Sequence, residues 1–186
     1  MTSAASVGGH ERPRLFAALL LPDETIRGLV RWQRETFEDV SDVRVVPPAN
    51  LHITLAFLGH RPAGDLGAIL AALSAAAVRA RRPALSVTRY RETRSVGMLA
   101  LEDDGGSATA FAEDLHRRLE ELEVYERERR RWLAHVTVLR FRRPPQLAPT
   151  VPDLGRISPS EAAVYHSVLR HTGAQYEVLE SVPLGS

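Results

Sequence analysis

Two short segments of this chain carry the same pair of polar residues at the same spacing. Residues 51–59 contain His52 and Thr54, and residues 133–141 contain His135 and Thr137, each 83 positions after its counterpart. Side chains of a strand alternate between its two faces, so each His shares a face with its Thr while apolar residues occupy the other. A single His-x-Thr is typical of an ordinary half-buried strand. Its repetition predicts two related halves that present both pairs to one site.

The four polar side chains suit acid–base chemistry on a phosphate. Histidine changes charge near neutral pH, with an unperturbed pKa of about 6.5. Two histidines in one cleft can hold opposite protonation states, so that one accepts a proton from water while the other donates a proton to a departing alkoxide. The hydroxyls of Thr54 and Thr137 can donate hydrogen bonds to anionic oxygens. We therefore expect cleavage of a phosphodiester by water, without a metal ion or a covalent nucleophile.

Other kinds of chemistry have less support. His52 and His135 provide two imidazoles, whereas a catalytic zinc usually has three protein ligands, and no Asp or Glu neighbours either motif. The chain has no Cys, and its 24 basic residues are all Arg, which excludes thiol nucleophiles and lysine Schiff bases. Glycine-rich nucleotide-binding motifs are also absent from the sequence. We expect neither a metal nor a cofactor.

Length and composition predict one globular domain. The chain has 186 residues, of which 44% are hydrophobic, and we expect a loose tail over 1–13 followed by a single domain over 14–186. The formal net charge is +1, so any preference for anions must be local. The apolar run 15–21 is too short for a signal peptide or a membrane span, and Pro22 follows it directly. We therefore expect a soluble, cytoplasmic protein that does not bind membranes.

Hydrophobic patterns and turn residues predict the elements that position the two motifs. Helices are expected over 23–37, 64–80 and 107–122, and charged or proline-rich loops over 123–131 and 142–160. This order favours an α+β fold, with helices packed on antiparallel sheets, over a doubly wound parallel sheet. The expected strands are 14–21, 43–46, 51–59, 84–90, 96–102, 133–141, 161–169 and 175–182.

The two motif segments resemble the signature of the two-histidine (2H) phosphoesterases. The branch they resemble most is the RNA 2′,3′-cyclic phosphodiesterases, also called 2′-5′ RNA ligase-like proteins. Ala134 stands where the family usually has Pro, and the run 126–131 is unusually basic. The resemblance covers nearly the whole chain and is carried by residues 14–22, 50–59, 134–140, 164–169 and 173–176.

The resemblance implies a bilobed fold in which two antiparallel sheets face each other across a central cleft, with helices on the outside. It implies hydrolysis of a ribose 2′,3′-cyclic phosphate to a 2′-phosphate end. His52 would be the proton donor to the leaving 3′-oxygen and His135 the proton acceptor from water, although the near two-fold symmetry leaves this assignment open. Thr54 and Thr137 would bind the phosphate.

The expected partner is RNA with a 2′,3′-cyclic phosphate end or a small cyclic nucleotide, bound by a monomer. Two alternatives stay open: 2′-5′ ligation by the same histidines, and an RNA-end or nucleotide-binding module without turnover. The sequence does not identify the physiological substrate.

Several further residues are weaker candidates for substrate contacts. The family often has Arg at the position of Arg140, but strand alternation places Arg140 on the face opposite His135 unless a bulge redirects it. Arg94 could reach a phosphate. Tyr90, Phe57 and Tyr165 could stack on a base, although core packing is the better interpretation for each, and Phe57 is predicted to be core. The other histidines are interpreted as incidental, and the basic run near the second motif is an exposed face or a guide for RNA. The incidental histidines are His10, His60, His116, His166 and His171. The basic residues around the second motif are Arg127, Arg129, Arg130, Arg131, Arg142 and Arg143.

Overall fold

An antiparallel sheet of eight strands runs through the described part of the chain, residues 12–171 and 173–185 of a computed structural model. Residues 1–11, which include His10 and most of the predicted tail, lie outside the described residues. The strands lie close to their predicted positions. Their apolar and β-branched residues favour a half-buried strand. Their bounds are β1 Arg14–Leu20, β2 Val43–Val45, β3 His52–His60, β4 Leu85–Glu92, β5 Val96–Asp103, β6 His135–Phe141, β7 Glu161–Arg170 and β8 Gly173–Pro183.

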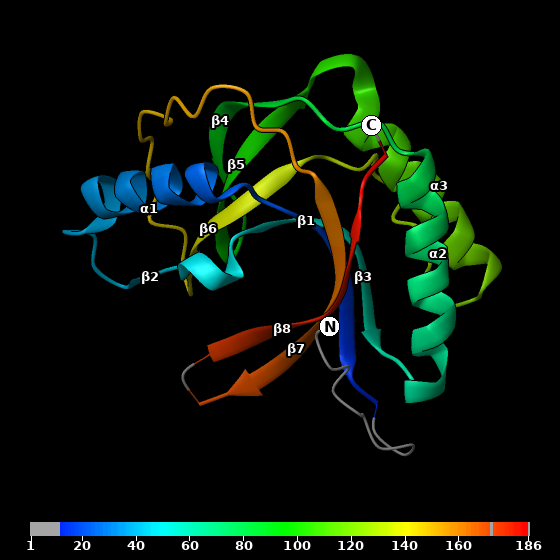
Figure 1. Cartoon of the computed structure of the whole chain (residues 1–186). Helices are drawn as coiled ribbons and strands as arrows, with labels where there is room; N and C mark the ends of the chain where they lie inside the picture. The colour runs from blue at the N-terminus through cyan, green and yellow to red at the C-terminus, as the bar shows by residue number, and fades with distance from the viewer. Residues whose placement is uncertain (1–11, 172, 186) are drawn as a thin grey trace.

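Three α-helices cover the sheet (Figure 1). They are α1 Asp23–Phe37, α2 Leu66–Arg79 and α3 Ser107–Glu121, and α2 and α3 lie side by side. Each helix buries an apolar stripe in the core, for example Phe111, Leu115 and Leu119 of α3. Short 3₁₀ turns at Pro48–Asn50, Ala63–Asp65 and Asp104–Gly106 precede β3, α2 and α3. Among the described residues, no helix is long and apolar enough to span a membrane.

The sheet consists of two halves that meet at one residue pair. The strand order is β4-β5-β6-β3-β1-β7-β8, with β2 also paired to β6. Between β6 and β3 the paired residues are Ile53 and Val136, which lie at the middle of the two motifs. The predicted α+β fold is confirmed, and its two predicted sheets are the halves β2-β4-β5-β6 and β1-β3-β7-β8 of one hydrogen-bonded sheet.

Each motif strand contains a β-bulge three residues after its histidine. The register between β1 and β3 skips Leu55, and the register between β5 and β6 skips Val138. An extra residue in a strand reverses the alternation beyond it. Phe57 and Arg140, each five residues after a histidine, therefore return to the face that carries the motif side chains, which we call the motif face.

The first bulge overturns one sequence expectation. Phe57 was predicted to be core by continuing the alternation of residues 51–55, and this prediction was wrong because Leu55 is the extra residue. The Phe57 side chain is 50% exposed, and Leu58 is buried in its place. Phe57 stacks on Phe16 with their ring centroids 5.6 Å apart.

Candidate active site

The Ile53–Val136 pair brings the two His-x-Thr motifs together. Because the two strands are antiparallel, the register that pairs Ile53 with Val136 places His52 towards Thr137 and Thr54 towards His135. Ile53 and Val136 are buried in the core, while the four polar side chains are partly exposed on the motif face. The arrangement has approximate two-fold symmetry about the central pair.

Both histidine rings are oriented by the same contact. The Nδ1–H of His52 donates to the carbonyl oxygen of Asn50 at 2.8 Å, and that of His135 donates to the carbonyl oxygen of Leu133 at 2.9 Å. A proton held on Nδ1 leaves Nε2 as the atom that gains or loses a proton. Each motif therefore offers one Nε2 for proton transfer.

His52 lies in an aromatic environment that favours its neutral form. Its ring centroid is 4.9 Å from that of Phe16, 5.9 Å from that of Tyr165 and 5.4 Å from that of Tyr176. Burial lowers the pKa of His52 to about 4, although its bond to Asn50 opposes the shift, and the nearby charges of His135 and Arg140 lower the pKa further. The hydroxyl of Thr54 donates to the free Nε2 at 3.0 Å. In the free protein this imidazole is neutral at neutral pH.

Arg140 lies on the motif face, as the bulge at Val138 requires. It is close enough to His52 to lower the pKa of that ring, and its guanidinium donates to the Tyr176 hydroxyl at 3.4 Å. Tyr176 in turn presents its ring to His52 at an interplanar angle of 78°. The side-chain amide of Asn50, next to the first motif, donates to the carbonyl oxygen of Ala174 at 2.8 Å and ties the start of β8 to the site.

Sequence reasoning did not identify Tyr176 as a site residue. No local motif marks it, because its contact with Arg140 of β6 depends on how the β7–β8 hairpin is placed in the fold.

The chain is similar to known proteins in both sequence and structure. The chain matches the family model described as LigT like phosphoesterase over residues 19–94. It is 34% identical over 184 residues to the RNA 2′,3′-cyclic phosphodiesterase of Thermus thermophilus, covering 92% of this chain and 90% of that protein. The chain belongs to the LigT-like (2H) phosphoesterase family. The predicted family is confirmed, and membership confirms the prediction of an enzyme of the phosphoesterase class.

Solved LigT-like structures share the fold. TT0787 of Thermus thermophilus superposes with a TM-score of 0.78 at 30% identity, covering 92% of this chain and 97% of that chain. Escherichia coli LigT complexed with phosphate superposes with a TM-score of 0.70 at 26% identity, covering 95% of this chain and 99% of that chain. The similarity therefore extends over both halves of the sheet.

Two buried side chains hold the motif bulges of this LigT-like protein. His116 of α3 donates from Nε2 to the carbonyl oxygen of Leu55 at 2.7 Å. Gln33 of α1 donates from Nε2 to the carbonyl oxygen of Val138 at 2.8 Å. Both are almost fully buried, at 4% and 2% exposure. Each half thus has a helix side chain bound to the bulged residue that directly follows its threonine.

His116 was interpreted as incidental from the sequence, and Gln33 was not singled out. A lone polar residue on an apolar helix stripe was the only signal for either of them.

The structure places Tyr90 and Arg94 away from the two motifs. Tyr90 pairs with Leu99 on the core face, where its hydroxyl donates to Glu92 at 3.2 Å. Burial and the Glu92 carboxylate raise the pKa of Tyr90 above its usual value. Arg94 is exposed in the turn between β4 and β5. Within the described residues, neither side chain has a hydrogen bond or an ion pair with a motif residue.

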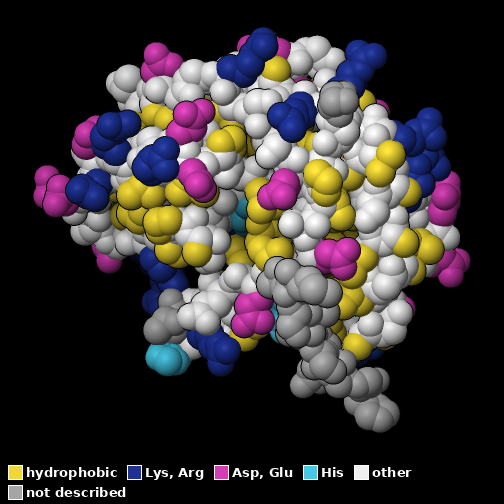
Figure 2. All heavy atoms as spheres, viewed as in Figure 1, with side chains coloured by type: hydrophobic (Ala, Val, Ile, Leu, Met, Phe, Trp, Pro, Cys, Tyr) yellow, Lys and Arg dark blue, Asp and Glu magenta, His cyan; other side chains and the backbone are white. Residues whose placement is uncertain are grey.

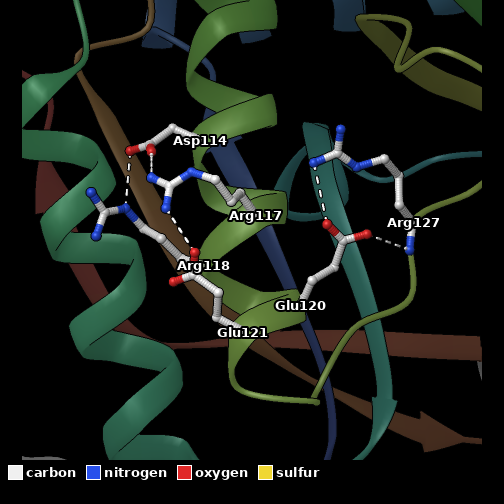
Figure 3. Close-up of polar contacts among 6 residues, drawn as sticks. All are labelled: Asp114, Arg117, Arg118, Glu120, Glu121 and Arg127. Carbon is white, nitrogen blue, oxygen red and sulfur yellow. Dashed lines mark hydrogen bonds and ion pairs between the residues drawn. The ribbon is translucent and has the colours of Figure 1, made fainter.

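Part of the basic run before the second motif is occupied by ion pairs. Arg127 bonds to the carboxylate of Glu120 on α3 through both its backbone N–H and its guanidinium, at 3.2 and 3.3 Å (Figure 3). Arg130 lies 3.8 Å from the Glu128 carboxylate. Positive and negative side chains are interspersed on the face shown in Figure 2. Arg127 therefore attaches the loop to α3, and such exposed pairs add little stability.

Proposed function

We propose that this protein hydrolyses the 2′,3′-cyclic phosphate of RNA or a nucleotide to a 2′-phosphate end, without a metal ion, through His52 and His135. The observation that carries this proposal is the pairing of the two motifs at Ile53 and Val136, with one Nε2 from each available on the motif face. A relative that is 34% identical is named RNA 2′,3′-cyclic phosphodiesterase, and E. coli LigT has been crystallised with phosphate.

The proposed reaction is a single displacement at phosphorus. His135 Nε2 accepts a proton from water as the water oxygen forms a bond to phosphorus. The bond from phosphorus to the 3′-oxygen breaks, and His52 donates a proton from Nε2 to that oxygen. The hydroxyls of Thr54 and Thr137 and the guanidinium of Arg140 stabilise the charge that develops on the phosphate oxygens. The product carries a 2′-phosphate and a free 3′-hydroxyl.

The donor role of His52 depends on the bound phosphate. In the free protein burial lowers the pKa of this ring to about 4, and the nearby charges of His135 and Arg140 lower it further. A phosphate anion beside Arg140 offsets that repulsion and favours the imidazolium form. The Thr54 hydroxyl, which donates to His52 Nε2 in the free protein, then turns to a phosphate oxygen and releases Nε2.

The test is turnover of adenosine 2′,3′-cyclic phosphate by EDTA-treated protein, with the product separated from authentic 2′-AMP and 3′-AMP. We expect 2′-AMP. The variants His52→Ala and His135→Ala should lose turnover and remain folded, whereas His60→Gln should behave as the wild type, because His60 is an exposed residue at the far end of β3. Near-wild-type turnover by either alanine variant would refute the two-histidine mechanism. Binding of the cyclic nucleotide by wild type without turnover would refute hydrolysis and support a binding module.

A further inference from the structure

Arg89 and Arg91 of β4 lie on the motif face, next to the second motif. Arg89 pairs with Ala100, which pairs with His135, and Arg91 pairs with Met98, which pairs with Thr137. Residues directly opposite each other in an antiparallel sheet share a face, so both arginines share the face of the motif. Two strand spacings, ~10 Å, separate each arginine backbone from the motif backbone.

The two arginines are available for a ligand. Both are exposed, and among residues 12–171 and 173–185 neither side chain has a hydrogen bond or an ion pair. Glu92 is turned away, because its carboxylate accepts hydrogen bonds from the backbone of Gln146 and Leu147 and from Tyr90. Glu102 shares the motif face by its register but makes no ion pair with either arginine.

The two halves of the motif face differ in chemistry. The half formed by β1, β3, β7 and β8 presents the half-exposed ring of Phe57 and the partly exposed ring of Tyr176, both packed on the buried ring of Phe16. The half formed by β2, β4, β5 and β6 presents guanidinium groups: Arg44, Arg89, Arg91 and Arg140, with Arg44 placed there by its pairing with Arg140. Aromatic faces bind bases and guanidinium groups bind phosphates, which is the combination used for single-stranded nucleic acids.

An RNA strand whose cyclic phosphate lies between the two motifs can contact the basic half of the motif face. This step rests on the proposed function, because it requires a cyclic phosphate bound between the motifs. A 2′,3′-cyclic phosphate closes the 3′ end of a strand, so the rest of the RNA continues from the 5′-oxygen of that nucleotide. On the basic half, β4 is an edge strand, so a chain that crosses Arg89 and Arg91 can leave over the edge of the sheet.

We propose that Arg89 and Arg91 bind backbone phosphates of the nucleotides that precede the cyclic end, so that this protein favours an RNA strand over a cyclic mononucleotide. These contacts carry no sequence information, because they involve phosphates alone. They give the affinity for an RNA strand a stronger dependence on salt than the affinity for a mononucleotide, whose single phosphate they do not contact.

The test compares two substrates, an oligouridylate pentamer ending in a 2′,3′-cyclic phosphate and uridine 2′,3′-cyclic phosphate. The double variant R89Q/R91Q should raise KM for the pentamer about tenfold and leave kcat and KM for the mononucleotide unchanged. The slope of log affinity against log salt should fall by about 1.4 for two lost contacts. The matched control R31Q/R34Q removes two exposed charges from α1 and should leave both substrates unaffected.

Two outcomes would overturn this proposal while the proposed function stands: an unchanged KM for the pentamer, or equal increases for both substrates. If wild type cleaves neither substrate, the proposed function fails. Fluorescence anisotropy of a labelled pentamer with a plain 3′-hydroxyl then tests the surface by itself. Weaker binding by R89Q/R91Q than by R31Q/R34Q supports the proposal, and equal binding refutes it.

Discussion

The hydrogen bond from His116 to the bulge in β3 can be removed by one substitution that keeps the shape of the core. His116→Phe removes the Nε2–H that donates to the Leu55 carbonyl at 2.7 Å. It retains an aromatic ring against Tyr125, whose ring centroid lies 4.8 Å from that of His116. A buried acceptor without a donor costs about 1–3 kcal/mol, and we expect the free energy of unfolding to fall by that amount at pH 7.5. Because Leu55 follows Thr54 directly, displacement of the bulge should also reduce kcat, by up to about 100-fold for a shift of 1 Å.

The loss of stability caused by His116→Phe should depend on pH, and the direction of that dependence follows from the pKa of His116. Burial lowers the pKa of His116 below its usual 6.5, so at acid pH the unfolded state binds more protons than the folded state. The stability that His116 contributes is therefore present above pH 6.5 and is lost as the pH falls towards the folded pKa. The Phe variant lacks this titration. The difference in unfolding free energy between wild type and His116→Phe should accordingly shrink between pH 7.5 and pH 5.

Urea unfolding at pH 7.5, 6.5, 5.5 and 5.0, with kcat measured at pH 7.5, tests both statements. Gln33→Met is the companion variant, since it removes the donor to Val138 at the second bulge without introducing or removing a titratable group. It should be destabilised by about 1–3 kcal/mol and keep the pH dependence of wild type. Equal stability of wild type and His116→Phe at pH 7.5 would refute the reasoning, as would a constant difference across the pH range.

Three other predictions concern the histidines and the first bulge. In the free protein, NMR titration should give His52 a pKa of about 4. The variant His135→Ala should raise this pKa, because it removes a nearby positive charge. An ordinary pKa for His52 would show that the ring is not buried as described. A nitrophenyl phosphodiester has a leaving group that needs no proton, so His52→Ala should still hydrolyse it and His135→Ala should not. The opposite result would make His135 the proton donor and His52 the proton acceptor. Leu58→Ala should cost about 2–5 kcal/mol of stability and Phe57→Ala clearly less, since Phe57 is half exposed and Leu58 is buried; equal losses would contradict the bulge at Leu55.

Local sequence patterns predicted the elements well but not the faces of the motif strands. The repeated His-x-Thr and the alternation of apolar residues were sufficient to place β3 and β6 and to pair them in one site. Strict alternation failed after Thr54 and Thr137, because one extra residue reverses every later side chain. Phe57 was therefore assigned to the core, and Arg140 could be placed on the motif face only by allowing a bulge. Nothing in the composition of residues 51–59 or 133–141 marks the bulges, whose carbonyl oxygens accept hydrogen bonds from His116 and Gln33 of distant helices.

The same backbone pattern in both halves makes their differences informative. Each half repeats a histidine, a threonine two residues later, a bulged residue at the third position and an outward side chain at the fifth, which is Phe57 in one half and Arg140 in the other. Burial lowers the pKa of His52, whose ring lies among those of Phe16, Tyr165 and Tyr176, and Arg140 lies on the motif face with both histidines. An anion beside Arg140 removes a repulsion that His52 experiences, and so couples phosphate binding to protonation of His52. The near symmetry of the sequence motifs leaves the acid and base roles open, and the proposed assignment follows the family resemblance and is tested by the nitrophenyl phosphodiester.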